Sequence, residues 1–111
     1  DNPATTSRRV IEEVIRSEIG FDGLLMSDDV SMNALSGDFA TRASAIFAGG
    51  CDVTLHCNGD RAEMDAVVSV TPTLSGESLR RANAVMAAFK APDKSDEAAL
   101  RDEFEGLMAA S

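Results

Sequence analysis

The sequence predicts an α/β fold in which helices cover parallel strands. Segments with helical periodicity alternate with two short strand-like segments. The first of these, Leu24-Leu25-Met26, is apolar throughout, whereas a half-exposed hairpin strand alternates apolar and polar residues. A parallel strand covered on both faces has this composition. The 111 residues suffice for one small domain with a hydrophobic core.

The first expected element is an amphipathic helix over about residues 6–18. Its apolar residues recur at helical spacing: Val10, Ile11, Val14 and Ile15. Gly20 is suited to end this helix in a left-handed conformation. Phe21-Asp22-Gly23 then turns the chain into the first strand.

Ser27, Asp28 and Asp29 follow the first strand, at its carboxyl end. In α/β folds the reactive groups lie beyond this end of parallel strands. Adjacent residues of an extended chain point to opposite sides, so the two aspartates are not expected to form one paired site. One of them can face a cleft as a nucleophile while the other binds loop backbone. The alternative is that both only end the strand as turn formers.

The following segments continue the alternation of strand and helix. Residues 31–37 are loop-like, and Asp38 is a plausible N-cap for a helix through Phe47, which Gly49-Gly50 ends. Residues 51–57 then alternate as a second strand, with Asp52, Thr54 and His56 on one side.

Three further helices are expected after the second strand. Asp60 and Glu63 form a capping box for a helix to about Val70. A second helix runs from Ser75 to about Lys90, and residues 91–94 form a short linker. The final helix, residues 95–110, places four apolar residues on one side: Leu100, Phe104, Leu107 and Met108. We expect this side to pack on the outside of the fold.

Two polar residues of the second strand have both structural and functional interpretations. His56 lies at the carboxyl end, where a neutral imidazole can bind a substrate hydroxyl, or where a histidine can be satisfied within the fold. Asp52 lies at the amino end, where a buried ion pair is the usual role of a carboxylate.

Cysteine content and charge exclude several kinds of site and partner. Cys51 and Cys57 are separated by about 20 Å on an extended strand, so we expect free thiols, which favour the cytoplasm. With one histidine and no Cys-x-x-Cys pair, we expect no metal and no cofactor. The net charge of −9 argues against nucleic acid and anionic membranes as partners.

The segment VIRSEIGFDGLLMSDDVSM, residues 14–32, resembles the active-site signature of glycoside hydrolase family 3. Together with PATTS upstream and AGGCDVTLHCN downstream, it is similar to the bacterial β-N-acetylhexosaminidases of that family, which recycle cell-wall sugars. The resemblance is dense from Pro3 to Asn58 and thin after Ala66.

The resemblance implies that Asp28 is the catalytic nucleophile. It would attack the anomeric carbon of a terminal β-linked N-acetylglucosamine in a peptidoglycan-derived fragment, form a covalent intermediate, and retain configuration after hydrolysis. Asp29 and Ser27 would orient the loop, and Met32 would form an apolar wall near the sugar.

The resemblance also implies parts that this sequence lacks. The general acid/base of this group is a histidine in a K-H-F-P-G-H-G-D-type loop, and the only histidine here is His56. A complete (β/α)8 barrel needs about 250 residues. We therefore expect residues 1–111 to be the C-terminal part of such a barrel, with its last two strands and outer helices, inactive without the missing N-terminal part. The alternative is a non-catalytic barrel remnant that binds sugar or completes a partner.

Overall fold

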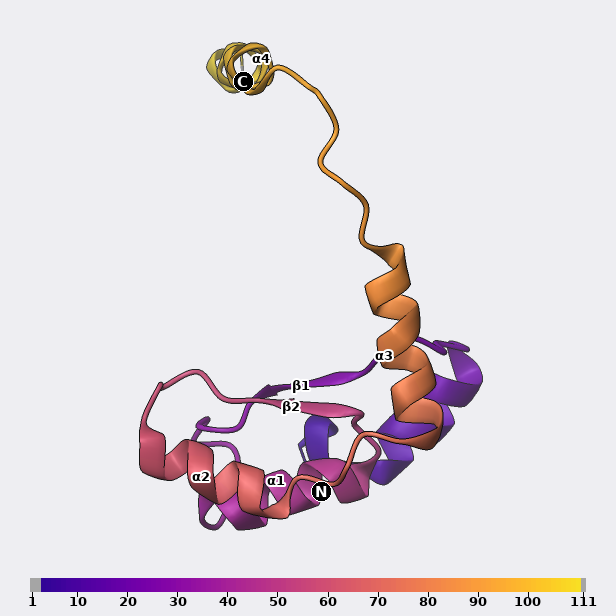
Figure 1. Cartoon of the computed structure of the whole chain (residues 1–111). Coiled ribbons are helices and arrows are strands. Elements are labelled where there is room, and N and C mark those ends of the chain that lie inside the picture. Colours follow the sequence, from indigo (N-terminus) through magenta and orange to yellow (C-terminus); the bar gives the residue numbers. More distant parts are fainter. Residues whose placement is uncertain (1–2, 111) are drawn as a thin grey trace.

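The computed structural model describes residues 3–110 and combines short helices with a two-stranded sheet (Figure 1). In chain order the elements are η1 (Ala4–Thr6), η2 (Val10–Glu18), β1 (Met26–Asp29), α1 (Phe39–Gly49), β2 (Val53–Leu55), α2 (Arg61–Val70), α3 (Gly76–Ala88) and α4 (Glu97–Ala109).

The two strands are parallel, which confirms the predicted α/β class. Met26 lies opposite Val53 and Asp29 lies opposite Leu55, with an irregularity between these pairs. Helix α1 connects the strands, as a parallel pair requires. Helices α1 and α2 lie along the same face of the sheet (Figure 1).

The hydrophobic core lies between the sheet and these helices. Its buried members come from η2, from α1, from α2 and from the loops beside the strands: Ile11, Val30, Leu35, Ala43, Ile46, Cys51 and Val67. Met26 is 56% exposed, so the prediction that the first strand is covered on both faces is wrong. The reason is that α1 and α2 cover only one face (Figure 1).

The first predicted helix is divided and irregular. A 3₁₀ turn, η1, comes first, and η2 is a π-helix, in which Ile19 N donates to Val14 O over 2.8 Å. Residues four apart share a face in either helix type, so the apolar spacing did not distinguish them. Gly20 has a φ of 72°, which confirms the predicted left-handed stop.

The strand boundaries also differ from the prediction. Strand β1 begins at Met26 and contains Ser27, Asp28 and Asp29, although Leu25 O already accepts bonds from Asp52 N and Val53 N. These polar residues extend the strand because their backbone groups can pair with β2. Strand β2 covers three residues rather than the predicted seven.

The helix caps follow the sequence closely. Asp38 accepts a hydrogen bond from Thr41 N at the start of α1, and Gly50 ends it with a φ of 111°. Asp60 accepts from Glu63 N at the start of α2, which is one half of the predicted capping box. The other half is wrong, because the Glu63 carboxylate binds His56 and Asn58 instead.

Asp52 joins the amino ends of the strands to two helices and confirms its predicted ion-pair role. Its side chain is 2% exposed and accepts from Arg16 Nη2 over 2.8 Å and Arg81 Nη1 over 3.0 Å. Ser78 Oγ and Leu25 N also donate to it, over 2.6 and 2.8 Å. Burial of this carboxylate opposes ionisation, but the hydrogen bonds and the Arg81 charge outweigh it and lower its pKa.

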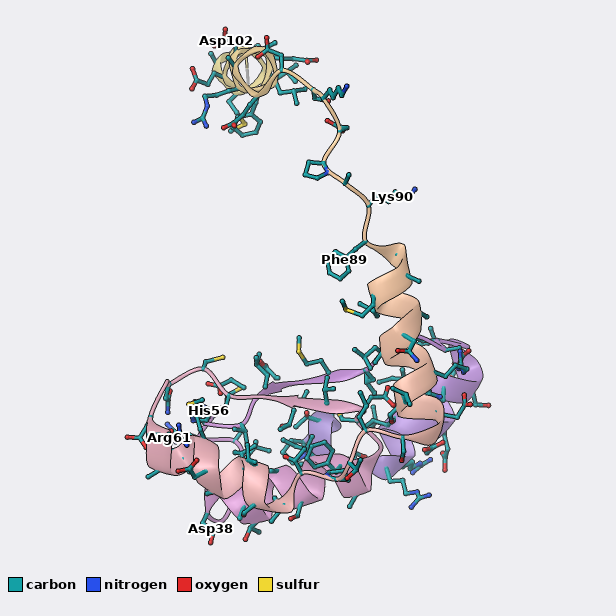
Figure 2. All side chains as sticks on the ribbon, viewed as in Figure 1. Asp38, His56, Arg61, Phe89, Lys90 and Asp102 are labelled. Atoms are coloured by element: carbon teal, nitrogen blue, oxygen red, sulfur yellow. The ribbon has the colours of Figure 1, made fainter. Side chains whose placement is uncertain are left out.

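Helix α4 lies apart from the other elements, at the end of an extended segment that begins at Phe89 and Lys90 (Figures 1 and 2). Every residue of α4 is exposed, so the predicted packing of its apolar side is wrong for this structure. Within residues 3–110, no helix has the length and apolar character needed to span a membrane.

Candidate active site

Asp28 lies near the carboxyl end of β1 with an exposed side chain. The strand alternates, so Ser27 is buried on the helix-covered side while Met26 and Asp28 lie on the open side. Ser27 Oγ is 3.1 Å from Thr54 Oγ1 and accepts from Leu55 N over 3.0 Å. This hydroxyl therefore fixes the backbone that carries Asp28 against β2.

The Asp28 carboxylate has one hydrogen bond to the backbone, from Asp29 N to Oδ1 over 2.8 Å. This contact orients the carboxylate and leaves it accessible from the open side. An accessible, oriented carboxylate has the geometry that a nucleophile or a general base needs.

Asp29 points to the other side and binds the loops that follow both strands. Its carboxylate accepts from Ser31 N over 3.1 Å, from Ser31 Oγ, and from Cys57 N over 3.2 Å. The Ser31 hydroxyl is the main cause of the lowered pKa of Asp29. The two aspartates thus have different hydrogen-bond partners, although both line one pocket.

A pocket of about 230 Å³ lies beside the two aspartates. Besides the aspartates, its lining comes from Met32, Ala34 and Leu35 and from residues 3–5. The structure therefore brings Asp28 and Met32 together at one pocket. The role of residues 3–5 was missed, because nothing in their sequence indicates that they approach the end of β1.

His56 lies at the end of β2 near the start of α2 (Figure 2). Its Nε2 is 2.7 Å from Glu63 Oε2. Its ring packs against Phe39 in a T-shaped arrangement, with the two ring centres 5.6 Å apart. It does not line the pocket that contains Asp28 and Met32. These contacts favour the second interpretation of His56, a histidine whose partners lie within the fold.

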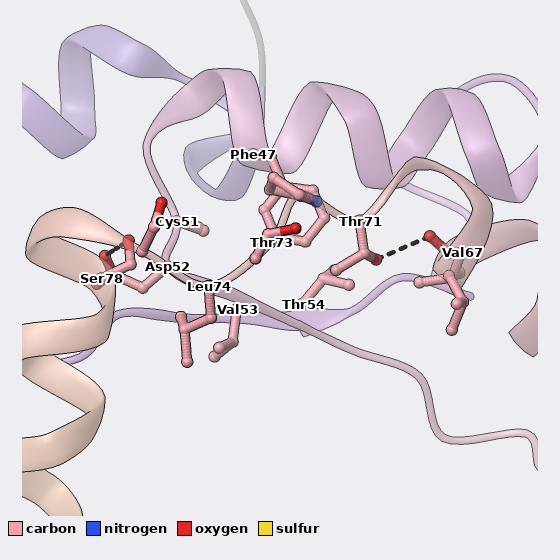
Figure 3. A pocket seen from close by; sticks show the side chains of 13 residues that line it. Phe47, Cys51, Asp52, Val53, Thr54, Val67, Thr71, Thr73, Leu74 and Ser78 are labelled. Carbon is pink, nitrogen blue, oxygen red and sulfur yellow. Dashed lines mark hydrogen bonds between the residues drawn. The ribbon is translucent and has the colours of Figure 1, made fainter.

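A larger cavity of about 490 Å³ lies between β2, the helices and residues 71–75 (Figure 3). Thr54 points toward Thr71 inside it, and the Asp52 carboxylate lies at one end beside Ser78. Asp28 is not among its lining residues. The Asp52 carboxylate is already bound by two guanidinium groups, so it is not free to react in this cavity.

Comparison with known proteins identifies a family match over most of the chain. Residues 1–89 match the N-terminal domain of glycosyl hydrolase family 3. A protein named beta-hexosaminidase from Bordetella pertussis is 39% identical over 95 residues, which cover 82% of this chain and 26% of that protein. A beta-hexosaminidase from Aromatoleum aromaticum is 36% identical over 94 residues, 83% of this chain and 26% of that protein.

A third relative shares a shorter segment. The beta-hexosaminidase of Pseudomonas aeruginosa strain LESB58 is 43% identical over 74 residues, 65% of this chain and 22% of that protein. The chain thus spans about a quarter of the length of the curated relatives that it matches.

Proposed function

The chain belongs to glycosyl hydrolase family 3, and we propose that it forms part of a retaining β-N-acetylhexosaminidase with Asp28 as its nucleophile. Its substrate would be terminal β-linked N-acetylglucosamine of peptidoglycan-derived fragments. The observation that carries this proposal is the position of Asp28, an accessible carboxylate near the carboxyl end of a parallel strand and beside a pocket. The names of the relatives support the choice of sugar.

In the proposed mechanism, an Asp28 oxygen attacks the anomeric carbon as the bond to the leaving oxygen breaks. A covalent glycosyl-enzyme forms while the proton donor, supplied by other sequence, protonates the leaving oxygen. Water then attacks the same carbon, gives a proton to that group, and breaks the bond to Asp28, which releases the sugar with retained configuration. The hydrogen bond from Asp29 N to Asp28 Oδ1 holds the carboxylate in one orientation for the attack.

Three neighbours of Asp28 support this chemistry without reacting. Ser27 fixes the strand through Thr54 and Leu55, and Asp29 fixes the loops. Met32 provides an apolar wall for one face of the sugar. His56 is bound to Glu63 away from this pocket, so we do not assign it a substrate contact.

The proposed enzyme needs a proton donor and further strands that residues 1–111 do not supply. We infer that a partner segment supplies the proton donor and the other strands of a (β/α)8 barrel, whose interior the open face with Met26 and Asp28 would line. Free Cys51 and Cys57 favour a reducing compartment, and we place the protein in the cytoplasm.

The test combines this chain with the part of the Bordetella pertussis relative that lies outside the match, which under this proposal contains the histidine loop. Hydrolysis of a chromogenic N-acetylglucosaminide reports activity. Asp28→Ala should lower kcat by on the order of 10⁴-fold, because the covalent step is lost. Azide should restore turnover in this variant and yield a glycosyl azide of inverted configuration, since it takes the place of the missing carboxylate.

The matched control is Asp65→Ala, which removes an exposed carboxylate of α2 paired with Arg61. It should leave kcat unchanged. Full activity of Asp28→Ala would disprove the nucleophile assignment. An assembled but inactive wild-type complex that still binds N-acetylglucosamine would instead favour the non-catalytic, sugar-binding alternative.

A further inference from the structure

The loop between β1 and α1, residues 30–37, forms one wall of the pocket beside Asp28 without regular secondary structure. Val30 N donates to Leu55 O over 2.8 Å, Met32 N donates to Asp29 O over 3.2 Å, and Leu35 N donates to Met32 O over 3.1 Å. Val30 and Leu35 are buried in the core, whereas Met32 is 42% exposed. A segment with so few backbone hydrogen bonds opens readily unless other parts of the molecule hold it. Its shape therefore depends on contacts from neighbouring elements.

Arg42, in the first turns of α1, binds this loop at three carbonyl groups. Its Nε donates to Gly37 O over 2.8 Å. Its Nη1 donates to Val30 O over 3.2 Å and to Met32 O over 3.4 Å. One guanidinium group thus contacts the two ends of the loop, Val30 and Gly37, and also Met32, one of the residues that line the pocket.

The Arg42 guanidinium is itself held in place by an aromatic side chain. It lies 5.4 Å from the centre of the Phe39 ring, within the range of a cation–π contact. The Phe39 and His56 rings pack in a T-shaped arrangement, and His56 Nε2 is 2.7 Å from Glu63 on α2. Successive contacts, Glu63 with His56, His56 with Phe39, and Phe39 with Arg42, therefore connect α2 to the loop that lines the pocket.

We propose that Arg42 is a positioning residue that holds the 30–37 loop, and with it Met32, against the sugar pocket. The identity of the ligand rests on the proposed function of Asp28. In this arrangement His56 acts through Phe39 and Arg42 on the shape of the pocket. The only histidine of the chain thereby has a role at a distance from the substrate.

Hydrogen exchange of the chain itself tests the structural part of the proposal. Arg42→Lys keeps the charge, but a single ammonium group cannot reproduce the fork of donors that binds several carbonyls. Backbone amides of residues 30–37 should exchange about tenfold faster, while those of α2 keep their rates. Arg61→Lys, on an exposed arginine paired with Asp65, is the control and should change neither set. Unchanged loop exchange in Arg42→Lys would overturn the proposal.

Kinetics of the assembled complex test the functional part. Arg42→Lys should raise KM about tenfold and change kcat less than about threefold, because the wall binds the sugar without taking part in bond breaking. A lowered kcat with unchanged KM would contradict the proposed role. If Asp28→Ala stayed active while Arg42→Lys still loosened the loop, the nucleophile assignment would fail and the loop contact would stand.

Discussion

Asp28 lies in β1 and Asp52 directly precedes β2, and their surroundings differ. Asp52 is enclosed by Arg16, Arg81 and Ser78, whereas Asp28 has one backbone donor and open access. A carboxylate held by two cations is suited to stabilise the fold, and an accessible one is suited to react. These surroundings support a structural role for Asp52 and the proposed role of Asp28 as nucleophile.

The ion-pair role of Asp52 was predictable from its place at the amino end of a strand, but its partners were not. Arg81 is 29 residues away in sequence, and only tertiary packing brings it to Asp52. The partners of His56 were likewise not predictable from the sequence. Its position allowed both a sugar contact and a structural role, and the contacts that favour the structural role come from Phe39 and Glu63, which belong to different helices.

Asp52→Asn should lower the free energy of unfolding by about 3 kcal/mol or more, because the nearly buried Arg16 loses its carboxylate partner and Arg81 keeps only the exposed Asp22, 3.5 Å away. Urea unfolding followed by circular dichroism measures this. The control Asp65→Asn removes an exposed pair and should cost less than about 1 kcal/mol. Equal losses in the two variants would contradict the role of Asp52.

Wild type and Asp52→Asn should also differ in how their unfolding free energy depends on pH. The folded-state pKa of Asp52 is lowered, so its stabilisation is present above the unfolded-state pKa of about 3.9 and is lost as pH falls through the folded value. The difference in unfolding free energy between wild type and Asp52→Asn should therefore be constant near pH 6 and shrink below about pH 4. A difference that stayed constant down to pH 2 would argue against an ionic contribution.

Among the elements, the caps were predicted well and the element types and lengths less well. Asp38 and Gly50 act locally through their own side chain or backbone angles, so the sequence near them was sufficient. The start of β1 depends instead on pairing with β2, and the π-helical form of η2 depends on wide turns that apolar spacing does not reveal.

Close contact between η1 and α1 gives a prediction at this scale. A Cβ added to Gly49 would lie 3.1 Å from the carbonyl carbon of Thr6. Gly49→Ala gains up to about 1 kcal/mol of helix propensity, but overpacking costs about 1–3 kcal/mol. We expect a net loss of about 1 kcal/mol in unfolding free energy by urea titration.

Gly106→Ala is the matched control for Gly49→Ala. It also replaces a helical glycine, but a Cβ at Gly106 meets no atom within 4 Å. This variant should therefore gain helicity in α4 without lowering stability. If Gly49→Ala proved as stable as Gly106→Ala, the contact between η1 and α1 would be looser than its distances indicate.

The whole molecule is a one-sided α/β unit. Helices α1 and α2 cover one face of the sheet (Figure 1). The alternating burial of β1 leaves Met26 and Asp28 exposed on the other face. An apolar residue and the candidate nucleophile thus share an open surface at the centre of the fold. A two-stranded sheet with unpaired edges is marginally stable, which favours association with further strands.

The proposed barrel predicts that the open face is the surface on which the chain assembles. Met26→Lys should weaken binding to the remaining part of the Bordetella pertussis relative at least about tenfold, because assembly would bury an unpaired charge. Met86→Lys, on α3, makes the same substitution at a residue of similar exposure, 67% against 56%, and should leave affinity unchanged. Calorimetric titration measures both affinities. Equal weakening by the two variants would place the contact elsewhere, and weakening by Met86→Lys alone would assign assembly to α3, whereas loss confined to Met26→Lys supports an interior formed by the face that carries Asp28.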